Sequence, residues 1–210
     1  MSLFISFEGI DGCGKTTQLQ LLRSHLEKMG YPVVTTREPG GTALAEAIRN
    51  YLLHSSQALE ARAELLLFSA ARAQHVAELI RPALNLGKVV LCDRFADSTV
   101  AYQGGGLGLE IDFITRLNSF ATDSLQPDIT FLLDVAPQMG WQRRSGMDEE
   151  DRIESRGLDF QERVRAAFLD LASSEPTRVV VIDGALPVEE VHRRIVEVLQ
   201  ERDLIRKQNA

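Results

Sequence analysis

The sequence of 210 residues has few cysteines, no long apolar run and fewer basic than acidic side chains. Cys13 and Cys92 are too few for a disulfide framework and lack the spacing of a zinc site, which predicts two free thiols. Nowhere do about 18 apolar residues follow one another, as a membrane-spanning helix would require. The first apolar run, at residues 3–7, is only strand-length, so we expect a cytoplasmic protein without a signal peptide or a membrane partner.

A net charge of −7 and four scattered histidines narrow the classes of partner further. A broad nucleic-acid surface needs clustered Lys and Arg to neutralise phosphates, so we expect no nucleic-acid partner. The histidines form no His-x-x-x-His pair, so hydrogen-bonded or solvated side chains are favoured over a metal site. With 44% hydrophobic and 25% charged residues the chain has a globular composition, and its length predicts one domain over residues 1–210.

The apolar pattern alternates between short runs and helical stretches. The short runs predict buried strands at residues 3–7, 32–35, 88–92, 129–133 and 178–182. The helical stretches cover residues 15–28, 43–53, 60–84, 110–122, 137–144, 158–173 and 187–204. Such alternation predicts an α/β fold, a parallel sheet of about five strands wrapped by helices. Three stretches of unusual composition are predicted to be loops, at residues 37–42, 104–108 and 145–152.

Residues 9–16 read Gly-Ile-Asp-Gly-Cys-Gly-Lys-Thr and fit the pattern Gly-x-x-x-x-Gly-Lys-Ser/Thr of a phosphate-binding loop. The loop lies between a predicted strand and a helix amino terminus, which favours this interpretation over a plain glycine-rich turn. Gly9, Gly12 and Gly14 allow the backbone amides to converge on an anion. The sequence lacks an Asn-Lys-x-Asp guanine reader and a Leu-Ser-Gly-Gly-Gln transporter signature, so a kinase is favoured over a switch or a motor.

Several side chains around this loop suit a nucleoside triphosphate with Mg²⁺. Lys15 supplies a cation for the β and γ phosphates, and the hydroxyl of Thr16 is a ligand for Mg²⁺, with Thr17 adding another hydroxyl. Asp93 and Arg94 follow the third predicted strand and so reach the same edge of the sheet. Asp93 suits the Mg²⁺ shell and Arg94 suits a phosphate; a salt bridge that caps the strand is the alternative.

A second group of residues suits a phosphorylated acceptor. Arg37 follows the second predicted strand in the turn Arg-Glu-Pro-Gly-Gly-Thr, so Arg37 and Arg94 could clamp a monophosphate. Phe68 and Arg72 are four residues apart and share a helix face, a pair that suits a base. Phe68 belongs to an apolar run, however, and the pattern alone favours core packing for its ring.

In order and spacing, the segments FEGIDGCGKTTQ, TREPGGT, LLLFSAARAQH, CDRFADSTVAYQGGG and DRIE resemble the thymidylate kinase family of nucleoside monophosphate kinases. The resemblance covers most of the chain. It implies the three-layer αβα fold of P-loop NTPases, a homodimer, and the reaction of ATP and dTMP to ADP and dTDP with Mg²⁺. The alternatives are a kinase for another small nucleotide or nucleoside, and a nucleotide-binding regulator without activity.

The resemblance also implies roles for individual residues. Phe68 would stack on thymine after all, Arg72 would bond a thymine carbonyl, and Tyr102 would disfavour a ribose 2′-hydroxyl. Asp11 would face the 3′-hydroxyl of the sugar, and Pro39 would follow a cis peptide bond. The acceptor residues implied are Asp11, Arg37, Glu38, Phe68, Arg72, Arg94, Ser98, Thr99, Tyr102 and Gln103. The nucleotide-binding residues implied are Gly9, Ile10, Asp11, Gly12, Cys13, Gly14, Lys15, Thr16 and Thr17, with Thr16 and Asp93 for the metal.

Residues of about 143–156 are expected to form a lid that supplies catalytic charge. Cys13 stands where some members of the family carry an arginine in the phosphate loop, so lid arginines would act on the transferring phosphate. We favour Arg143 and Arg152, at the two ends of the lid, with Arg144 as the alternative. Lys15, Asp93 and Arg94 complete the predicted catalytic group, and the middle of the lid, residues 145–150, carries mainly acidic charge.

Overall fold

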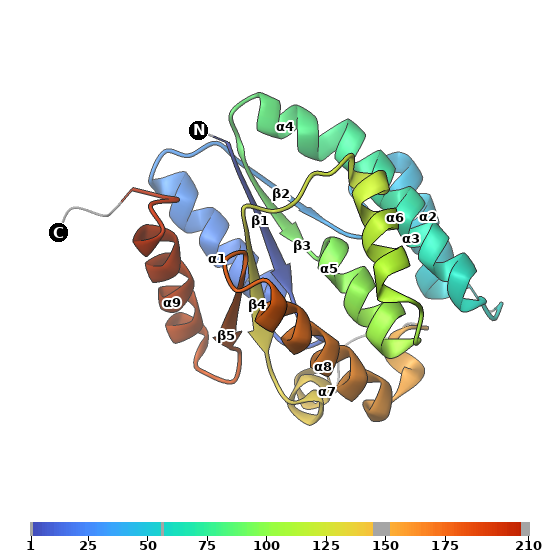
Figure 1. Ribbon diagram of the computed structural model, residues 1–210. Helices are drawn as coiled ribbons and strands as arrows, with labels where there is room; N and C mark the ends of the chain where they lie inside the picture. The colour runs from blue at the N-terminus through green and yellow to red at the C-terminus, as the bar shows by residue number, and fades with distance from the viewer. Residues whose placement is uncertain (1, 56, 145–151, 207–210) are drawn as a thin grey trace.

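The computed structural model describes residues 2–55, 57–144 and 152–206. Within these residues, parallel strands form one sheet in the order β2-β3-β1-β4-β5 (Figure 1). The strands are β1 (Leu3–Glu8), β2 (Val33–Arg37), β3 (Val89–Asp93), β4 (Ile129–Asp134) and β5 (Val179–Asp183). Each predicted strand is present, with ends that shift by one or two residues, so the predicted fold class is confirmed.

Helical segments connect the strands and cover both faces of the sheet. In the described residues they are α1 (Lys15–Lys28), α2 (Ala43–His54), α3 (Ala61–His75), the π-helical η1 (Val76–Ile80), α4 (Arg81–Asn85), α5 (Ala96–Thr99), the π-helical η2 (Val100–Gly106), α6 (Ile111–Thr122), α7 (Pro137–Arg144), the 3-10 turn η3 (Glu154–Arg156), α8 (Leu158–Ser174) and α9 (Val188–Glu201). Helices α1 and α9 lie on one side of the sheet, and α4, α5, α6 and α8 lie on the other (Figure 1). This arrangement is the predicted three-layer αβα architecture.

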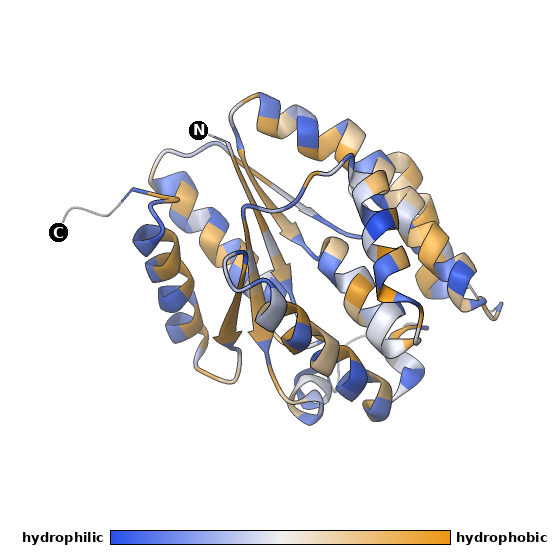
Figure 2. Ribbon diagram, in the orientation of Figure 1, coloured by the Kyte–Doolittle hydropathy of each residue, from blue (hydrophilic) through white to orange (hydrophobic). Residues whose placement is uncertain are grey.

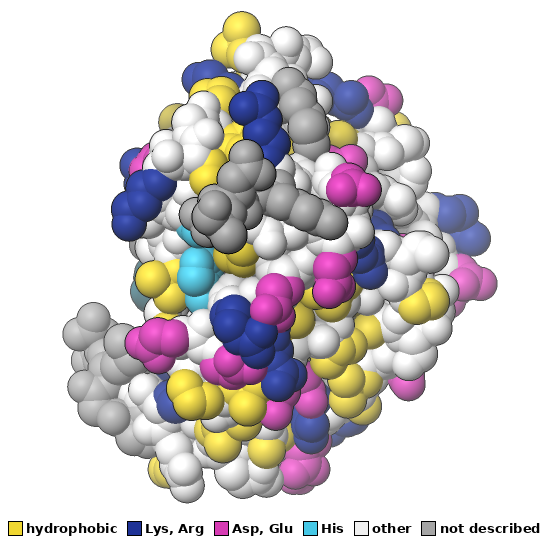
Figure 3. Space-filling view, turned by 90° about the vertical axis from the view of Figure 1, so that its left-hand side faces the viewer, with side chains coloured by type: hydrophobic (Ala, Val, Ile, Leu, Met, Phe, Trp, Pro, Cys, Tyr) yellow, Lys and Arg dark blue, Asp and Glu magenta, His cyan; other side chains and the backbone are white. Residues whose placement is uncertain are grey.

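The two faces of β1 explain how the sheet holds these layers. Because side chains alternate along a strand, Ile5 and Phe7 pack into a different buried cluster from Phe4, which contacts Phe95 edge to face. Figure 2 shows apolar residues along the strands and hydrophilic ones on the outer side of α9. On the face that α9 helps to form, basic and acidic side chains lie beside one another (Figure 3), as in the ion pairs of Arg193. The polar surface of α9 is therefore a solvated face.

The loop predicted at residues 104–108 is wrong for its first three residues, because residues 100–106 form η2 and continue the short helix α5. A run of three glycines usually interrupts a helix, so their pattern indicated a break. The glycines instead allow η2 to approach α8: a Cβ on Gly105 would lie 2.3 Å from the Cβ of Ala167, and one on Gly106 would lie 2.5 Å from Phe160 Cε2. These glycines are therefore needed for the packing of η2 on α8. A local sequence pattern carries no information about such a tertiary contact.

Two predicted helices differ in smaller ways. The predicted helix over residues 60–84 is a succession of α3, η1 and α4, in which the carboxylate of Glu60 caps α3 by accepting from Arg62 N and Ala63 N. The last helix was expected to reach residue 204 but ends at Glu201. The loops that follow β1, β2 and β3 all lie at the carboxyl edge of the sheet, where parallel α/β folds bind their ligands.

Candidate active site

The phosphate loop wraps tightly between β1 and α1. Gly12 has φ 76° and Gly9 has φ 132°, and a Cβ on Gly12 would lie 2.1 Å from the carbonyl oxygen of Gly140 in α7. Only glycine fits such a contact with a left-handed backbone. Lys15 is buried and its ammonium donates to the carbonyl oxygens of Gly9 at 3.2 Å and Ile10 at 2.9 Å. The loop therefore holds the ammonium of Lys15 beside the amino terminus of α1. The helix dipole favours a bound anion at this position, and the ammonium adds positive charge to it.

Thr16 and Asp93 meet at the mouth of this loop. The hydroxyl of Thr16 donates a hydrogen bond of 2.6 Å to Asp93 Oδ2, across the edge of the sheet. A hydroxyl and a carboxylate are oxygen donors of the kind that Mg²⁺ prefers. Within the described ranges no three His, Cys, Asp or Glu side chains gather as metal ligands.

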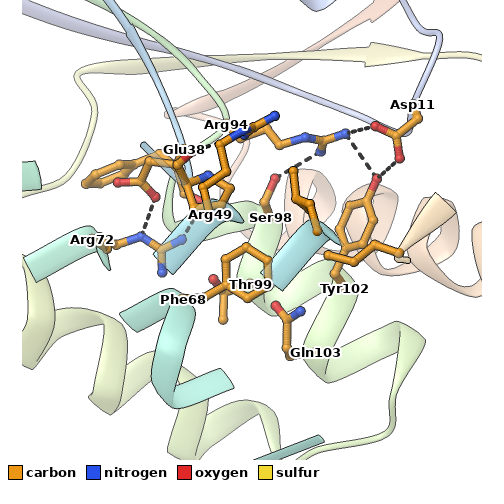
Figure 4. A pocket seen from close by; sticks show the side chains of 14 residues that line it. Asp11, Glu38, Arg49, Phe68, Arg72, Arg94, Ser98, Thr99, Tyr102 and Gln103 are labelled. Atoms are coloured by element: carbon orange, nitrogen blue, oxygen red, sulfur yellow. Dashed lines mark hydrogen bonds and ion pairs between the residues drawn. The ribbon is translucent and has the colours of Figure 1, made fainter. Parts of the chain in front are cut away.

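Arg94 connects the phosphate loop to the segment after β3. It has φ 69°, a left-handed conformation that is uncommon outside glycine and that recurs at functional sites. Its guanidinium donates to Gly9 O at 2.9 Å. It also donates to Ser98 Oγ at 3.2 Å, to Asp11 Oδ1 at 2.5 Å and to Tyr102 Oη at 3.1 Å (Figure 4). Contacts from several elements thus fix the orientation of this guanidinium.

Two carboxyls, Glu8 at the end of β1 and Asp11 in the phosphate loop, differ in pKa because their partners differ. Burial would raise the pKa of Asp11, but the positive charges of Arg94 and Lys15 lower it to about 2. Burial and the neighbouring Asp97 raise the pKa of Glu8 to about 8. Glu8 accepts from Phe95 N at 2.6 Å and from Ser98 Oγ at 2.5 Å, so it holds the turn that carries Arg94.

A cavity of about 140 Å³ opens beside Arg94 (Figure 4). Its lining combines apolar and polar side chains, a mixture typical of ligand sites: Asp11, Glu38, Pro39, Arg49, Leu53, Phe68, Arg72, Arg94, Phe95, Ser98, Thr99, Tyr102, Gln103 and Ile153. Phe68 is half-buried against the core and also lines the cavity. Its ring therefore takes part in core packing, as the apolar pattern predicted, and it also faces the space where the resemblance predicts a base. We call this space the acceptor cavity.

Arg72 is buried in the wall of the acceptor cavity. Its guanidinium donates to Glu38 Oε2 at 2.7 Å, to Asn118 Oδ1 at 2.8 Å and to the carbonyl oxygen of Phe95 at 3.1 Å. Glu38 also contacts His75 Nδ1 at 3.0 Å, so this carboxylate joins β2 to the end of α3. The Glu38–Pro39 peptide bond is cis, which confirms that prediction.

A second, larger cavity of about 630 Å³ surrounds the phosphate loop. Its lining includes the loop itself, Asp93, Arg143 and Arg144, and side chains from the start of α9 such as Val188. Four side chains, those of Asp11, Glu38, Arg49 and Arg94, line both cavities. The two spaces are therefore adjacent and meet at Arg94. We call the second space the phosphate-loop cavity.

The predicted clamp of Arg37 and Arg94 is only partly assembled, and a further arginine stands nearby. Arg37 lines the phosphate-loop cavity but is exposed and pairs with Glu46 at 3.1 Å. Arg49, on α2, lines both cavities and donates to the carbonyl oxygen of Pro39 at 3.0 Å. No motif marked Arg49, because a single arginine in a helix is usually part of a solvated face.

The predicted lid arginines occupy two different places. Arg143 and Arg144 line the phosphate-loop cavity, and Arg143 donates to the carbonyl oxygen of Gly184 at 2.9 Å. Arg152 lies elsewhere: its guanidinium donates to Glu64 Oε2 at 2.7 Å and to the carbonyl oxygen of Leu52 at 2.9 Å. The acidic middle of the predicted lid, residues 145–150, lies outside the described residues. The catalytic role of Arg152 stays a prediction.

Glu64 is a second residue that sequence reasoning missed. It is fully buried on α3 and bonds Gln103 as well as Arg152 and Arg156. In the sequence it precedes an apolar run and lies in no recognised motif. Both cysteines are free thiols, as predicted, and Cys13 is buried with its Sγ 3.6 Å from Lys15 Nζ.

The sheet is parallel and its first strand is followed by a phosphate loop. A cavity lined by aromatic and basic side chains lies next to this loop. Together these features define a P-loop kinase of small nucleotides. The thymidylate kinase family model matches residues 7–195. A thymidylate kinase of Symbiobacterium thermophilum is 50% identical over 202 residues, which cover 96% of this chain and 94% of that protein. One of Bifidobacterium longum is 53% identical over 203 residues, covering 95% of this chain and 98% of the relative.

Solved structures agree with the sequence comparisons. The crystal structure of thymidylate kinase from Ehrlichia chaffeensis matches with a TM-score of 0.78 at 42% identity, over 95% of this chain and 99% of that one. The chain belongs to the thymidylate kinase family, and the resemblance that its motifs predicted is confirmed. Among the residues that the structure describes, no helix combines the length and apolar character needed to cross a membrane.

Proposed function

We propose that this chain transfers the γ-phosphoryl group of ATP to the 5′-phosphate of dTMP, giving ADP and dTDP. The observation that carries the proposal is the junction of the two cavities, where Asp11, Glu38, Arg49 and Arg94 line both. A phosphate acceptor in one cavity and a phosphate donor in the other would meet at this junction. Holding both groups in contact supplies much of the catalysis of phosphoryl transfer.

On the donor side, the amides of the phosphate loop and Lys15 would hold the phosphates of ATP. Thr16 and Asp93 would hold Mg²⁺, which would supply positive charge to neutralise the phosphates of ATP. An oxygen of the acceptor phosphate attacks the γ phosphorus, and the bond from that phosphorus to the bridging oxygen of ADP breaks. Arg143 and Arg144 line this cavity, which supports a role for them in stabilising the migrating charge.

On the acceptor side, Phe68 would stack on the base and Arg72 would donate to a base carbonyl. A guanidinium has five N–H donors, more than its three bonds to Glu38, Asn118 and Phe95 use. The remaining wall residues proposed for the base and the sugar are Asp11, Ser98, Thr99, Tyr102 and Gln103. Tyr102 and Asp11 bond one another at 3.0 Å and together would face the deoxyribose.

The acceptor phosphate would lie against Arg94, which several contacts hold in place. Arg49 also lines both cavities, and Arg37 stands in the phosphate-loop cavity, so either could add positive charge. Glu38, which pairs with Arg72, would orient that guanidinium rather than touch the phosphate, since like charges repel. Because Arg94 lines both cavities, we propose that it contacts both the acceptor phosphate and the phosphates of ATP.

A coupled assay of ADP release with dTMP, dUMP, UMP, CMP and AMP as acceptors tests the proposal. We expect dTMP to give the highest kcat/KM. If another of these nucleotides were the better acceptor, the chain would still be a phosphotransferase, but dTMP would be rejected as its substrate. Lys15→Ala should lower kcat at least about 100-fold, and Lys28→Ala, at the far end of α1, serves as the control. A nucleotide-binding regulator without activity would release no ADP in either protein.

We further propose a homodimer of single-domain chains in the cytoplasm, each with a lid over residues of about 143–156. Large exposed apolar side chains on the neighbouring helices α3 and α6 support an interface: Leu66 is 55% exposed, Phe113 47% and Phe120 86%. Exposed apolar patches often mark interfaces between chains. Free thiols and the use of ATP support the cytoplasm as the compartment.

A further inference from the structure

Glu64 is a buried carboxylate that joins three segments beside the acceptor cavity. Gln103 Nε2 of η2 donates to its Oε1 at 2.9 Å. Arg152 Nη2 and Arg156 Nη2 donate to its Oε2 at 2.7 Å and 2.5 Å. Glu64 itself is 0% exposed. A buried charge with this many bonds fixes the orientation of each partner.

The charge of Glu64 decides how Gln103 is turned. Burial alone would raise the pKa of Glu64, but hydrogen bonds from Arg156 and Gln103 outweigh burial and lower it. An ionised carboxylate only accepts hydrogen bonds, so the group of Gln103 that faces Glu64 must be its NH₂. The carbonyl oxygen of the same amide must then point elsewhere. Gln103 lines the acceptor cavity and its amide end points into it (Figure 4).

The acceptor cavity therefore presents a fixed pattern of donors and acceptors. Arg72 offers only donors, and Gln103 offers a carbonyl oxygen. The edge of thymine carries the complementary groups, the O4 acceptor beside the N3–H donor. Cytosine carries the reverse, an amino group at C4 beside an N3 acceptor. If the amide of Gln103 were turned over, its NH₂ would face the base and suit cytosine instead.

We propose that Glu64 is a positioning residue that sets base specificity, by holding Gln103 with its carbonyl oxygen toward the N3–H of the acceptor base. The inference rests on the proposed function, because it takes the base to be a thymine. Glu64 does not line the cavity and acts only through Gln103. Arg152 and Arg156 serve this role by keeping the carboxylate ionised; Arg156 also stacks on the ring of Phe160, 5.0 Å from its centroid.

Glu64→Gln tests the proposal, because a glutamine can donate as well as accept and leaves the amide of Gln103 free to turn. We expect the ratio of kcat/KM for dTMP over dCMP to fall at least about tenfold. The ratio for dTMP over dUMP should change less than about twofold, since uracil and thymine share the O4 and N3–H edge. A general loss of cavity shape would change both ratios together, and that result would overturn the proposal.

Charge-matched variants separate this role from folding. Glu64→Gln leaves Arg152 and Arg156 without a buried counter-charge, so the double variant Glu64→Gln with Arg156→Gln restores the net charge of the group. The double variant should lose discrimination against dCMP, whereas Arg156→Gln alone keeps the carboxylate and should retain it. Equal discrimination in these two proteins would overturn the proposal.

A double-mutant cycle with Gln103→Ala shows whether Glu64 acts through Gln103. In the Gln103→Ala background, Glu64→Gln should change the ratio of dTMP to dCMP by less than about twofold, because the group that it orients is gone. The same tenfold loss in both backgrounds would mean that Glu64 affects specificity by another route, and the proposal would be wrong.

The wild-type enzyme supplies a measurement that needs no variant. A dTMP analogue methylated at N3 lacks the N3–H donor, so it should inhibit with an affinity at least about tenfold lower than that of dTMP. Equal affinity of the two ligands contradicts the proposal. If wild type does not phosphorylate dTMP at all, the proposed function fails; if it prefers dTMP and Glu64→Gln keeps that preference over dCMP, only the inference fails.

Discussion

Arg94 Nη2 lies 2.5 Å from Asp11 Oδ1, an ion pair that joins the phosphate loop to the residue after β3. The pair stands where the two cavities meet, since both residues line both spaces. Tyr102 bonds both partners, so this wall of the acceptor cavity is connected to the phosphate loop. Arg94 is therefore the side chain through which the two halves of the site are held in register.

Arg94→Lys should lower kcat/KM for dTMP at least about 100-fold, because an ammonium lacks the planar fork that binds several acceptors at once. The side chain of Arg94 bonds the phosphate loop, Ser98 and Tyr102 together, and a lysine cannot maintain this arrangement. The matched control is Arg165→Lys, which alters a paired arginine outside both cavities, on Asp134. Similar losses in the two variants would show that arginine geometry in general, and not this junction, is responsible.

Removal of Mg²⁺ with a chelator should stop phosphoryl transfer, and Thr16→Ala should raise the Mg²⁺ concentration needed for half-maximal rate at least about tenfold. The reason is the bond of 2.6 Å between the Thr16 hydroxyl and Asp93, which places two oxygen donors together. Titration of Mg²⁺ at saturating ATP gives the measurement. Thr115→Ala, on α6, is the control, and an unchanged Mg²⁺ requirement in Thr16→Ala would exclude the hydroxyl as a ligand.

Alanine variants of Arg143, Arg144 and Arg152 locate the catalytic charge. At least one of Arg143→Ala and Arg144→Ala should lower kcat about tenfold or more, roughly 1.4 kcal/mol of barrier, because both residues line the phosphate-loop cavity. Arg152→Ala should act mainly on the KM for dTMP, since Arg152 bonds Glu64 beside the acceptor cavity. If none of the three lowers turnover tenfold, the lid arginines do not supply the charge.

Glu8 predicts a pH dependence of stability. Its pKa is raised in the folded state to about 8, so the folded chain keeps a proton that the unfolded chain loses above about pH 4.5. This contribution to stability is therefore complete below the unfolded pKa and is lost as the pH rises through about 8. Urea unfolding between about pH 5 and pH 8 should show a flatter profile for Glu8→Gln than for wild type.

A matched surface variant completes this measurement. Glu162→Gln changes an exposed carboxylate on α8 and should leave the slope of stability against pH the same as in wild type. If the free energy of unfolding of Glu8→Gln changed with pH in the same way as that of wild type and of Glu162→Gln, Glu8 would not titrate in this range. Subtracting the profiles also removes contributions from other groups, such as His25 and His192, whose pKa values burial lowers.

Phe120→Asp should convert the proposed dimer to a monomer, because it places a charge on the most exposed aromatic ring of α6. Phe113 lies seven residues earlier and so shares this helix face. Sedimentation equilibrium measures the mass in solution. Trp141→Asp, which alters an exposed ring on α7, should stay dimeric, and a wild-type monomer would remove the proposed interface.

Much of the site could be predicted because its parts are continuous in the sequence. The phosphate loop is eight residues long, and its function depends on local backbone conformation between a strand and a helix. Phe68 and Arg72 share a helix face through their spacing alone. Glu64 and Arg49 lie in helices as well, but their importance comes from partners outside their own helices, such as Gln103 and Pro39. No local pattern records such partners.

The sequence by itself determined the strands, the phosphate loop, the family and the edge of the sheet where Asp93 and Arg94 stand. These follow from periodicity and from motifs whose residues are neighbours in the chain. Only the tertiary structure decided that Arg94 pairs with Asp11, 83 residues away, and that Arg152 bonds Glu64, 88 residues away. Buried charges are stable only beside specific partners, and those partners meet only once the helices pack on the sheet.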